Sequence, residues 1–287
     1  MTGTQQAETG LNQRLREFVL ADEDFAALRQ LVRELTGINL SDQKRELVYG
    51  RLSRRLRALN LTSFRQYRER LAADPREREQ LANAITTNLT AFFRERHHFD
   101  YLRDQVLRPL AADPRGARRV RIWSAGCSTG EEPYSIAMTV IEALTDLAGW
   151  DVRILATDLD SDVLERARAG VYPSERLRGL EPRHVTRFFT ERWDRKGRSL
   201  RVNAEVAALV TFKQLNLMHN WPIKGPLDVI FCRNTVIYFD KDTQRELFVR
   251  IAALQRSGDW LFLGHSESLF KVSSDYELIG RTVYRRA

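Results

Sequence analysis

The segment Val120–Tyr134, with the sequence VRIWSAGCSTGEEPY, constrains the fold of this chain more than any other stretch. It opens with alternating apolar residues, which are typical of a buried strand, and continues through a turn of glycine and small residues. Two glutamates and a proline then suit the first turn of a helix, where the helix dipole favours negative charge and a missing N–H costs nothing. Strand, glycine turn and helix form the unit that brings backbone close to a ligand at the carboxyl end of a parallel strand.

Several chemistries compete for this turn. A dinucleotide site would need G-x-G-x-x-G, which is absent, and two glutamates at the helix start would repel a pyrophosphate. A hydrolase nucleophile elbow fits Gly126–Gly130, with Ser128 as nucleophile and Asp228 and His265 following in the required order, although the chain lacks an HGGG-type oxyanion segment. A nucleoside or methionine-derived ligand is the third alternative, since its ribose hydroxyls and cationic groups suit acidic side chains. A strand-to-helix turn that binds nothing is the fourth.

The chain is predicted to contain two domains. Apolar residues recur at helical spacing through residues 1–90, which indicates a helical domain. Strand and helix patterns alternate through residues 91–287, which predicts an α/β fold with a mainly parallel sheet and a site at the carboxyl ends of its strands. Residues 173–209 break this alternation with hairpin-like runs, and we interpret them as a small inserted β-subdomain.

Two further segments place polar residues near this predicted site. Asn83–Arg96 interrupts the helical pattern with threonines, asparagines and an arginine, so we expect it to be a linker that lies over a ligand. A second strand is predicted to end at Asp158, and an acidic residue there commonly accepts hydrogen bonds from ribose hydroxyls. Because Asp160 and Ser161 can cap the helix that follows, Asp158 is predicted to be free for a ligand.

The charge of the chain indicates an acidic partner. The net charge is +8 and the isoelectric point is about 9.8, which suits nucleic acid, anionic lipid or an acidic protein. Residues 44–70 contain nine Lys/Arg against two Glu, and helical spacing allows the arginines at 51, 54, 55 and 57 to form a basic face. A solvated helical surface would explain the same pattern, but the imbalance favours a docking surface.

The compartment follows from what the sequence lacks. No apolar run approaches the length needed to span a membrane, and the first ten residues, MTGTQQAETG, lack the apolar stretch of a signal peptide. The two cysteines provide no disulfide framework. We therefore expect a cytoplasmic protein without membrane insertion.

Six segments in a fixed order resemble a known family. They are TNLTAFFRE (87–95), RIWSAGCSTGEEPYSIAM (121–138), ATDLD (156–160), GVY (170–172), FCRNTVIYF (231–239) and GHSESL (264–269). Together they resemble the CheR family of chemotaxis receptor methyltransferases, which use S-adenosylmethionine (SAM) to methylate glutamate side chains of bacterial chemoreceptors. The resemblance covers nearly the whole chain after about residue 22. It implies an N-terminal helical domain, a Rossmann-like SAM-dependent methyltransferase domain and an inserted small β-subdomain.

The resemblance also implies roles for individual residues. Arg94 and Tyr238 would lie beside the reacting methyl group. The chain departs from the family pattern at Thr235-Val236, where two apolar residues are usual. The residues implied to bind SAM, or its product S-adenosylhomocysteine (SAH), are Asn88, Thr90, Arg94, Glu132, Asp158, Asn216, Leu217, Arg233 and Asn234. No metal is implied.

The implied reaction suits the residues of the chain. A receptor glutamate with a pKa near 4.3 is already ionised at neutral pH, so it can attack the methyl carbon without a general base. The partners would be the helical cytoplasmic region of chemoreceptors, docked on the basic helices, and a receptor tethering peptide at the insert. We expect a monomer that does not bind nucleic acid. An RNA methyltransferase, or an esterase using Ser128, remains the alternative, and a binding module without activity is a third interpretation.

Overall fold

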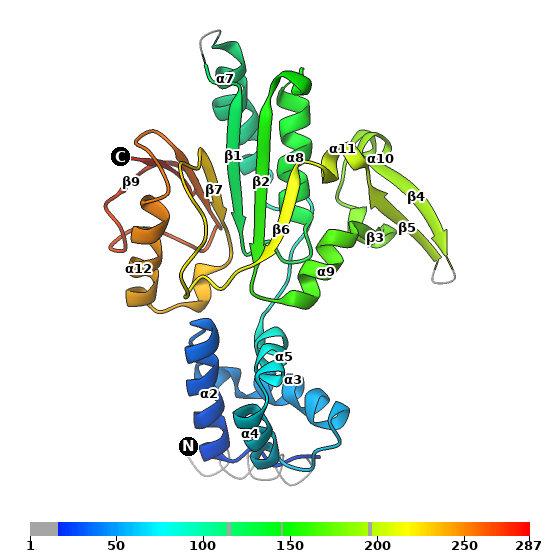
Figure 1. Ribbon diagram of the computed structural model, residues 1–287, viewed down its shortest axis with the longest axis vertical. Coiled ribbons are helices and arrows are strands. Elements are labelled where there is room, and N and C mark those ends of the chain that lie inside the picture. The colour runs from blue at the N-terminus through cyan, green and yellow to red at the C-terminus, as the bar shows by residue number, and fades with distance from the viewer. Residues whose placement is uncertain (1–16, 114–115, 145, 195–196) are drawn as a thin grey trace, which may run out of the picture. The chain divides into compact units, whose positions relative to one another are not determined.

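The computed structural model describes residues 17–113, 116–144, 146–194 and 197–287 (Figure 1). The chain divides into two compact units, Met1–Thr86 and Thr87–Ala287, whereas the sequence pattern placed the boundary at residue 90. The described helices of the first unit are α2 (Asp22–Thr36), α3 (Arg45–Ala58), α4 (Phe64–Ala73) and α5 (Pro75–Ile85), with the 3₁₀ turn η1 (Asp42–Lys44) before α3.

The helices of the first unit share one apolar core. Residues at helical spacing on each helix, such as Leu28, Leu52, Tyr67 and Leu81, are at most 1% exposed and pack together. The helix ends follow local chemistry. Gly37 ends α2 with φ of 74°, a left-handed conformation that glycine adopts without a steric penalty. The core therefore forms from the helical periodicity that the sequence shows.

Most of the cations in residues 44–70 have partners inside the first unit. Arg51 donates through Nη1 to the carbonyl oxygen of Thr86 at 2.7 Å, and also to those of Ala84 and Ile85, so it satisfies carbonyls at the end of α5. Arg55 forms a 2.6 Å ion pair with Glu77, whose side chain is 3% exposed. Carboxylates or carbonyls also pair with the arginines at 45, 57, 65, 68 and 70. The expected basic face is therefore much less open than the residue count indicates.

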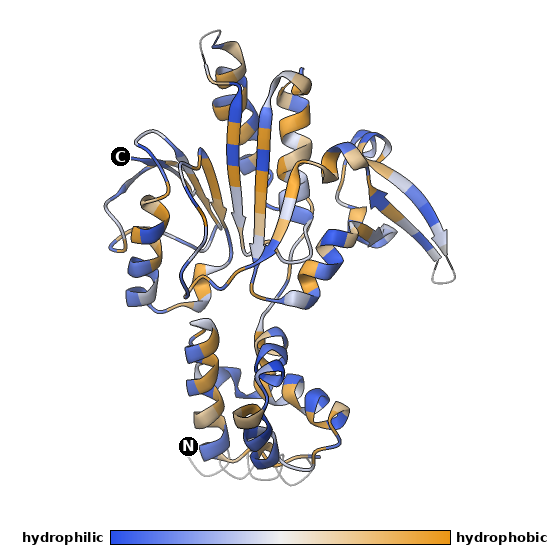
Figure 2. Ribbon diagram, viewed as in Figure 1, coloured by the Kyte–Doolittle hydropathy of each residue, from blue (hydrophilic) through white to orange (hydrophobic). Residues whose placement is uncertain are grey.

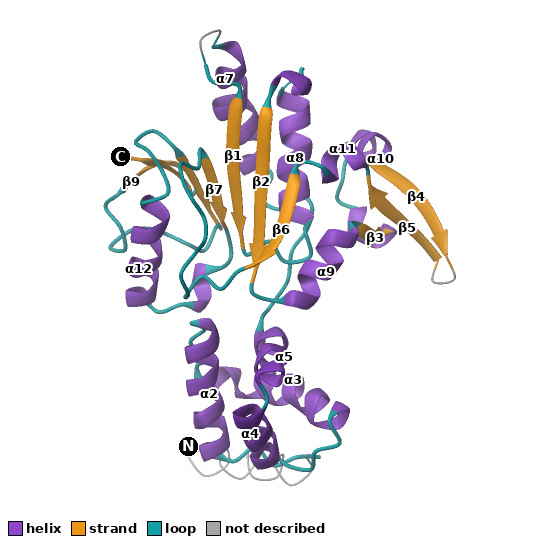
Figure 3. Ribbon diagram, viewed as in Figure 1, coloured by secondary structure: helices purple, strands orange, loops and turns teal. Residues whose placement is uncertain are grey.

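The second unit is built on a seven-stranded sheet with the order β6-β2-β1-β7-β8-β10-β9 (Figure 3). Pairing from β6 through β8 is parallel, and β10 is antiparallel to both β8 and β9. The strands are β1 (Arg119–Ala125), β2 (Asp151–Asp158), β6 (Val210–Gln214), β7 (Val229–Cys232), β8 (Trp260–Leu263), β9 (Tyr276–Gly280) and β10 (Val283–Arg286). From β1 the next strands in sequence, β2 and β6, are added on one side of the sheet, and from β7 the next strand, β8, is added on the other side. The strand order therefore reverses between β1 and β7, and α/β sheets bind ligands at such a point.

Two layers of helices cover the sheet. One core joins β1, through Val120 and Ile122, to α8 (Glu131–Ala143), α9 (Ser161–Ala169) and the helical segment 97–112. That segment consists of α6 (His97–Tyr101), the π-helical turn η2 (Leu102–Leu107) and α7 (Arg108–Ala112). The other core joins Trp123 of β1 to α12 (Lys241–Ala252). Alternate residues of β1 thus face opposite layers. The helix α8 is buried on nearly all sides, and its middle is largely apolar (Figure 2).

The insert forms a second, three-stranded antiparallel sheet in the order β3-β5-β4. Its strands are β3 (Val171–Pro173), β4 (Phe189–Asp194) and β5 (Gly197–Val202), accompanied by η4 (Ser174–Leu177), α10 (Pro182–Phe188) and α11 (Ala204–Ala207). The hairpin of β4 and β5 projects away from the large sheet (Figure 1). Lys196 of the expected hairpin turn lies outside the described residues.

None of the described helices is both long enough and apolar enough to cross a membrane.

Candidate functional site

The turn between β1 and α8 has little room for side chains. Gly126 has φ of 85°, and a Cβ atom there would lie 2.3 Å from Oγ1 of Thr235, in the loop after β7. Gly130 has φ of 97°, and its Cβ would lie 2.8 Å from the hydroxyl oxygen of Tyr172. Both positions therefore require glycine. The turn predicted from VRIWSAGCSTGEEPY is confirmed, at the carboxyl edge of the sheet.

Asp158 lies beside this turn and is 8% exposed. Its Oδ2 accepts a 2.8 Å hydrogen bond from the backbone N–H of Ser128, and its Oδ1 accepts a 3.0 Å bond from that of Asp160. As predicted, Asp158 is not the cap of α9, but its carboxylate is already engaged in ordering the turn. Each oxygen keeps a second lone pair for a ligand hydroxyl. Burial raises the Asp158 pKa to about 6, despite the two backbone hydrogen bonds.

Asp160 caps α9, as the sequence predicted, while Ser161 is the first residue of the helix. Oδ1 of Asp160 accepts from the N–H groups of residues 162 and 163, and its Oδ2 accepts from Nδ2 of Asn88 at 2.7 Å. The carbonyl of Asn88 in turn accepts from the Ser128 hydroxyl at 3.0 Å. These bonds fasten the linker, which also carries the half-buried Thr90, to the edge formed by β1 and β2.

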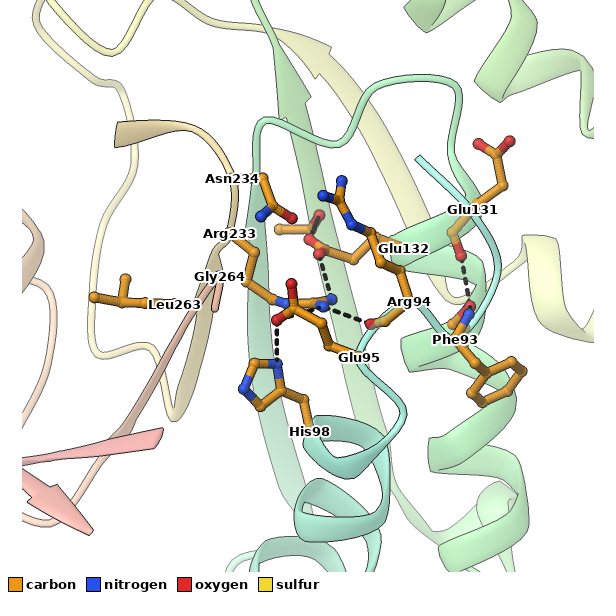
Figure 4. A network of polar contacts seen from close by, with 12 residues as sticks. Phe93, Arg94, Glu95, His98, Glu131, Glu132, Arg233, Asn234, Leu263 and Gly264 are labelled. Carbon is orange, nitrogen blue, oxygen red and sulfur yellow. Dashed lines mark hydrogen bonds and ion pairs between the residues drawn. The ribbon is translucent and has the colours of Figure 1, made fainter. Parts of the chain in front are cut away.

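Arg233, the first residue after β7, is at the centre of a buried polar network (Figure 4). Its guanidinium contacts Glu132 of α8 at 3.0 Å and Glu95 of the linker at 3.2 Å, and it donates to the carbonyl oxygen of Arg94. Ser124 of β1 donates to the second oxygen of Glu132 at 2.8 Å. The network joins the linker, the central turn and β7, with the arginine side chain only 1% exposed.

The network keeps Glu95 charged and His98 neutral. Burial alone would raise the Glu95 pKa, but its hydrogen bond to His265 and the charge of Arg233 outweigh burial and lower that pKa to about 2. Burial, followed by the charge of Arg233, lowers the His98 pKa to about 4. Sequence patterns gave no role to Glu95 or Ser124. Both lie in the segments that resemble the family, but spacing alone cannot show which carboxylate a distant arginine meets.

The remaining predicted residues lie at the same edge. The N–H of Leu215 donates to the carbonyl of Asp158 at 2.9 Å, which brings Asn216 and the buried Leu217 alongside the second strand. Asn234 follows Arg233 with φ of 56°. Tyr238 ends the short 3₁₀ turn η5 (Val236–Tyr238) and is half-buried. Arg94 is also half-buried, and its Nη1 donates to the carbonyl of Leu89 at 2.9 Å.

The hydrolase alternative requires Ser128, His265 and Asp228 to meet, and the structure separates them. Ser128 bonds to the linker, His265 bonds to Glu95 at 2.8 Å, and Asp228 precedes β7 at the opposite end of that strand from Arg233. Asp228 accepts there from the N–H of Arg121. A charge relay between these three residues cannot form in this geometry.

Comparison with known proteins agrees with this architecture. Residues 88–285 match the CheR methyltransferase SAM-binding domain, and residues 23–86 match the CheR methyltransferase all-alpha domain. The chain belongs to the CheR methyltransferase family. The fold predicted from the sequence, a helical domain followed by a SAM-dependent methyltransferase domain, is thereby confirmed.

Curated relatives match nearly the whole chain. Chemotaxis protein methyltransferase 2 of Pseudomonas aeruginosa is 48% identical over 95% of this chain and 96% of its own length. A probable chemotaxis protein methyltransferase of Rhizobium etli is 46% identical over 87% of this chain and 94% of its own. The chemotaxis protein methyltransferase of Escherichia coli K12 is 42% identical over 96% of this chain and 94% of its own length. This member of the CheR methyltransferase family is accordingly a SAM-dependent methyltransferase.

Proposed function

We propose that this enzyme transfers the methyl group of SAM to glutamate carboxylates of bacterial chemoreceptors, and so serves adaptation in chemotaxis. The observation that carries the proposal is the match, over almost the full chain, to relatives named chemotaxis protein methyltransferases. The products are a glutamate methyl ester and SAH. One carboxylate oxygen forms a bond to the methyl carbon while the carbon–sulfur bond breaks, and the sulfur keeps the electron pair.

This reaction requires positioning more than proton transfer. The attacking carboxylate is ionised at neutral pH, so it needs no base. Anion and sulfonium neutralise each other along the reaction path, so a water-poor pocket favours the transition state over solvated reactants. The buried histidine of the site, His98, is a poor base, because burial lowers its pKa to about 4. Its Nε2 is also engaged by the carbonyl of Arg281 and the hydroxyl of Thr282. The site therefore suits a reaction that needs no base.

In this proposal the cofactor lies along the carboxyl edge of β2, β1 and β7. Asp158 accepts hydrogen bonds from the ribose hydroxyls, and Asn216 and Leu217 border the adenine. The methionine end of the cofactor meets Glu132 and Arg233 of the buried network. It also meets Asn88, Thr90 and Arg94 of the linker, and Asn234 after β7.

Arg94 and Tyr238 are proposed to orient the reacting groups. A guanidinium and a phenol can each donate charge-assisted hydrogen bonds to a carboxylate. Arg94 accepts from Arg233 through its backbone carbonyl, and no dashed contact joins its side chain to the network (Figure 4). Its guanidinium is bonded at Nη1 to the carbonyl of Leu89 and has further donors for a carboxylate.

Receptor docking is proposed to use those basic residues whose charge has no internal partner. In the described part of the chain, Lys44 and Arg54 are exposed and form no ion pair, whereas Arg51 donates to backbone carbonyls and the other cations of residues 44–70 pair with carboxylates. A receptor tethering peptide could add a strand to β4, which is an edge strand and carries Trp193 with 72% exposure. The enzyme would act as a monomer without nucleic acid.

Methyl transfer from labelled SAM tests the substrate class. Receptor-containing membranes should acquire label that mild alkali releases as methanol, because a glutamate methyl ester hydrolyses under these conditions. RNA, and receptors in which the acceptor glutamates are replaced by alanine, serve as controls. Alkali-stable label, or label in RNA but not in receptors, would contradict the proposal.

A further inference from the structure

Glu267 has the most densely bonded carboxylate near the candidate site. It lies in the GHSES turn after β8 and is 4% exposed. Its Oε2 accepts from the backbone N–H of Asn234 at 2.8 Å and of Gly264 at 2.7 Å. Its Oε1 accepts from the N–H of Thr235 at 2.8 Å and of Val236 at 2.9 Å. Four backbone donors therefore converge on one buried side chain.

These donors solvate the charge of Glu267 in place of water. Within the described residues, no lysine, arginine or histidine forms an ion pair with it. Three of the N–H groups belong to consecutive residues at the start of η5, where the helical turn leaves its first donors unpaired. A carboxylate at this position satisfies those donors and interacts favourably with the positive end of the turn.

Glu267 holds a backbone conformation that is uncommon outside turns. Asn234 has φ of 56°, in the left-handed region that few residues other than glycine adopt, although asparagine tolerates it better than most. Gly264 packs so closely on this loop that a Cβ atom would lie 2.8 Å from the backbone nitrogen of Asn234. The surrounding contacts thus determine the path of the chain from Arg233 to Tyr238.

The same turn reaches the other side of the site. Nδ1 of His265, two residues before Glu267, bonds to Oε1 of Glu95 at 2.8 Å, and Glu95 follows Arg94 in the linker. The segment Gly264–Glu267 therefore links the loop that carries Asn234 and Tyr238 to the linker that carries Arg94.

We infer that Glu267 is a positioning residue for methyl transfer. Through the four backbone bonds it fixes Asn234 against the cofactor and places Tyr238 at the reacting methyl group, without touching either substrate. The inference rests on the proposed roles of Asn234 and Tyr238. It assigns a function to the GHSES segment, which neither the cofactor contacts nor the family resemblance had explained.

Glu267→Gln is the direct test, because the amide cannot accept hydrogen bonds at its nitrogen and would turn two hydrogens toward backbone donors. We expect kcat for receptor methylation to fall at least tenfold and SAH affinity several-fold. Asp228→Asn is the matched control. Asp228 also accepts a backbone N–H, from Arg121 at 2.7 Å, and pairs with Arg256, but at the opposite end of β7. Asp228→Asn should lower the melting temperature about as much as Glu267→Gln does. Its kcat and SAH affinity should nevertheless stay within twofold of wild type.

A double-mutant cycle with Tyr238→Phe separates positioning from general stability. If Glu267 acts through the loop that carries Tyr238, the double variant should lose less kcat than the product of the two single losses. Multiplicative losses, or equal effects of Glu267→Gln and Asp228→Asn, would overturn the inference. A Tyr238→Phe variant with normal kcat would instead overturn the proposed role of Tyr238, while the SAH affinity of Glu267→Gln would still report on Asn234.

Gly264→Ala covers the case in which Glu267→Gln does not fold. The added methyl group would press on the Asn234 backbone without changing any charge. It should lower kcat in the same direction as Glu267→Gln, and unaltered kcat and SAH affinity in a folded Gly264→Ala protein would contradict the inference.

Discussion

Both units of this enzyme pair an arginine with a buried glutamate, and the two clusters differ in what they hold together. In the helical unit, Arg55 of α3 meets Glu77 of α5, and Tyr67 of α4 donates to the same carboxylate at 3.0 Å. All three residues lie on helices. The cluster is a cross-link between elements that already share an apolar core.

In the methyltransferase unit, Arg233 meets Glu132 and Glu95, and two of these three residues lie on irregular backbone. The arginine side chain is 1% exposed, against 27% for Arg55, yet within the described residues its Nε has no hydrogen-bond partner. A buried network on loops that is not fully satisfied is costly, and such networks concentrate at functional sites. The comparison shows that the same pair of residue types stabilises one unit and orders the binding edge of the other.

Replacing each arginine by methionine should have the largest effect and separates the two roles. Arg233→Met leaves two buried carboxylates without a cation, and breaking such a pair costs about 3–5 kcal/mol. We expect methyl transfer to be lost and SAH binding to weaken at least a hundredfold. Arg55→Met should lower the melting temperature but leave the SAH dissociation constant within twofold. Calorimetric titration of both variants with SAH measures this, and equal affinities would remove the distinction.

Asp158→Ala should have the next largest effect. The loss of two hydrogen bonds to ribose hydroxyls weakens SAH binding by about 1–3 kcal/mol, which corresponds to roughly five- to 150-fold. Ser128→Ala is the neighbouring control, since among the residues that the structure describes its hydroxyl bonds only to the carbonyl of Asn88. Substantial activity should remain in Ser128→Ala. Unchanged SAH affinity in Asp158→Ala would show that the carboxylate orders the turn and does not bind ribose.

The pH dependence of SAH affinity should be smaller but specific. The Asp158 pKa is raised to about 6 in the free protein, and hydroxyl donors favour its ionised form. Affinity is therefore complete above pH 6 and declines as pH falls through 6, by up to about tenfold per pH unit. Asp158→Asn should bind SAH weakly with no such decline. A wild-type affinity that is constant from pH 7 to pH 5 would contradict the assignment.

Charge reversal in the helical unit should have the smallest effect on the isolated reaction. Lys44→Glu with Arg54→Glu should slow receptor methylation several-fold, reduce its salt dependence and leave SAH affinity unchanged. Arg118→Glu with Arg153→Glu makes the same change of charge near the amino ends of β1 and β2 and should not slow methylation. Equal slowing by both pairs would indicate that net charge matters and not a docking surface.

The sequence predicted the elements better than the contacts. The strand and glycine turn at Val120–Tyr134 were predictable because apolar alternation and the backbone freedom of glycine are local properties. The partners of Arg51 and Arg55 were not, because a helical wheel shows which side a residue faces but not the carbonyls or carboxylate that another helix places there. For the same reason, the sequence could not show that two of the four arginines of the predicted basic face, Arg51 and Arg55, bond inside the helical unit.

At the site, the limit was the same. Asp158 was correctly placed at the end of its strand, but its hydrogen bond from the Ser128 N–H depends on how the turn after β1 folds across β2. Glu95 and Glu267 are ordinary glutamates in sequence. Their roles arise only when the fold brings separate segments to one edge, across 31–33 residues for Glu267 and its backbone donors after β7 and across 170 residues for Glu95 and His265.

Hydrogen exchange of the backbone amides with and without SAH tests the central claim most directly, since it locates the ligand without any substitution. SAH should slow exchange in the central turn (126–132), the end of β2 (157–160), the segment after β6 (214–218) and the loop after β7 (233–238). Exchange in α2 to α5 should stay unchanged. Protection confined to the helical unit, or to the amino ends of the strands, would contradict the account.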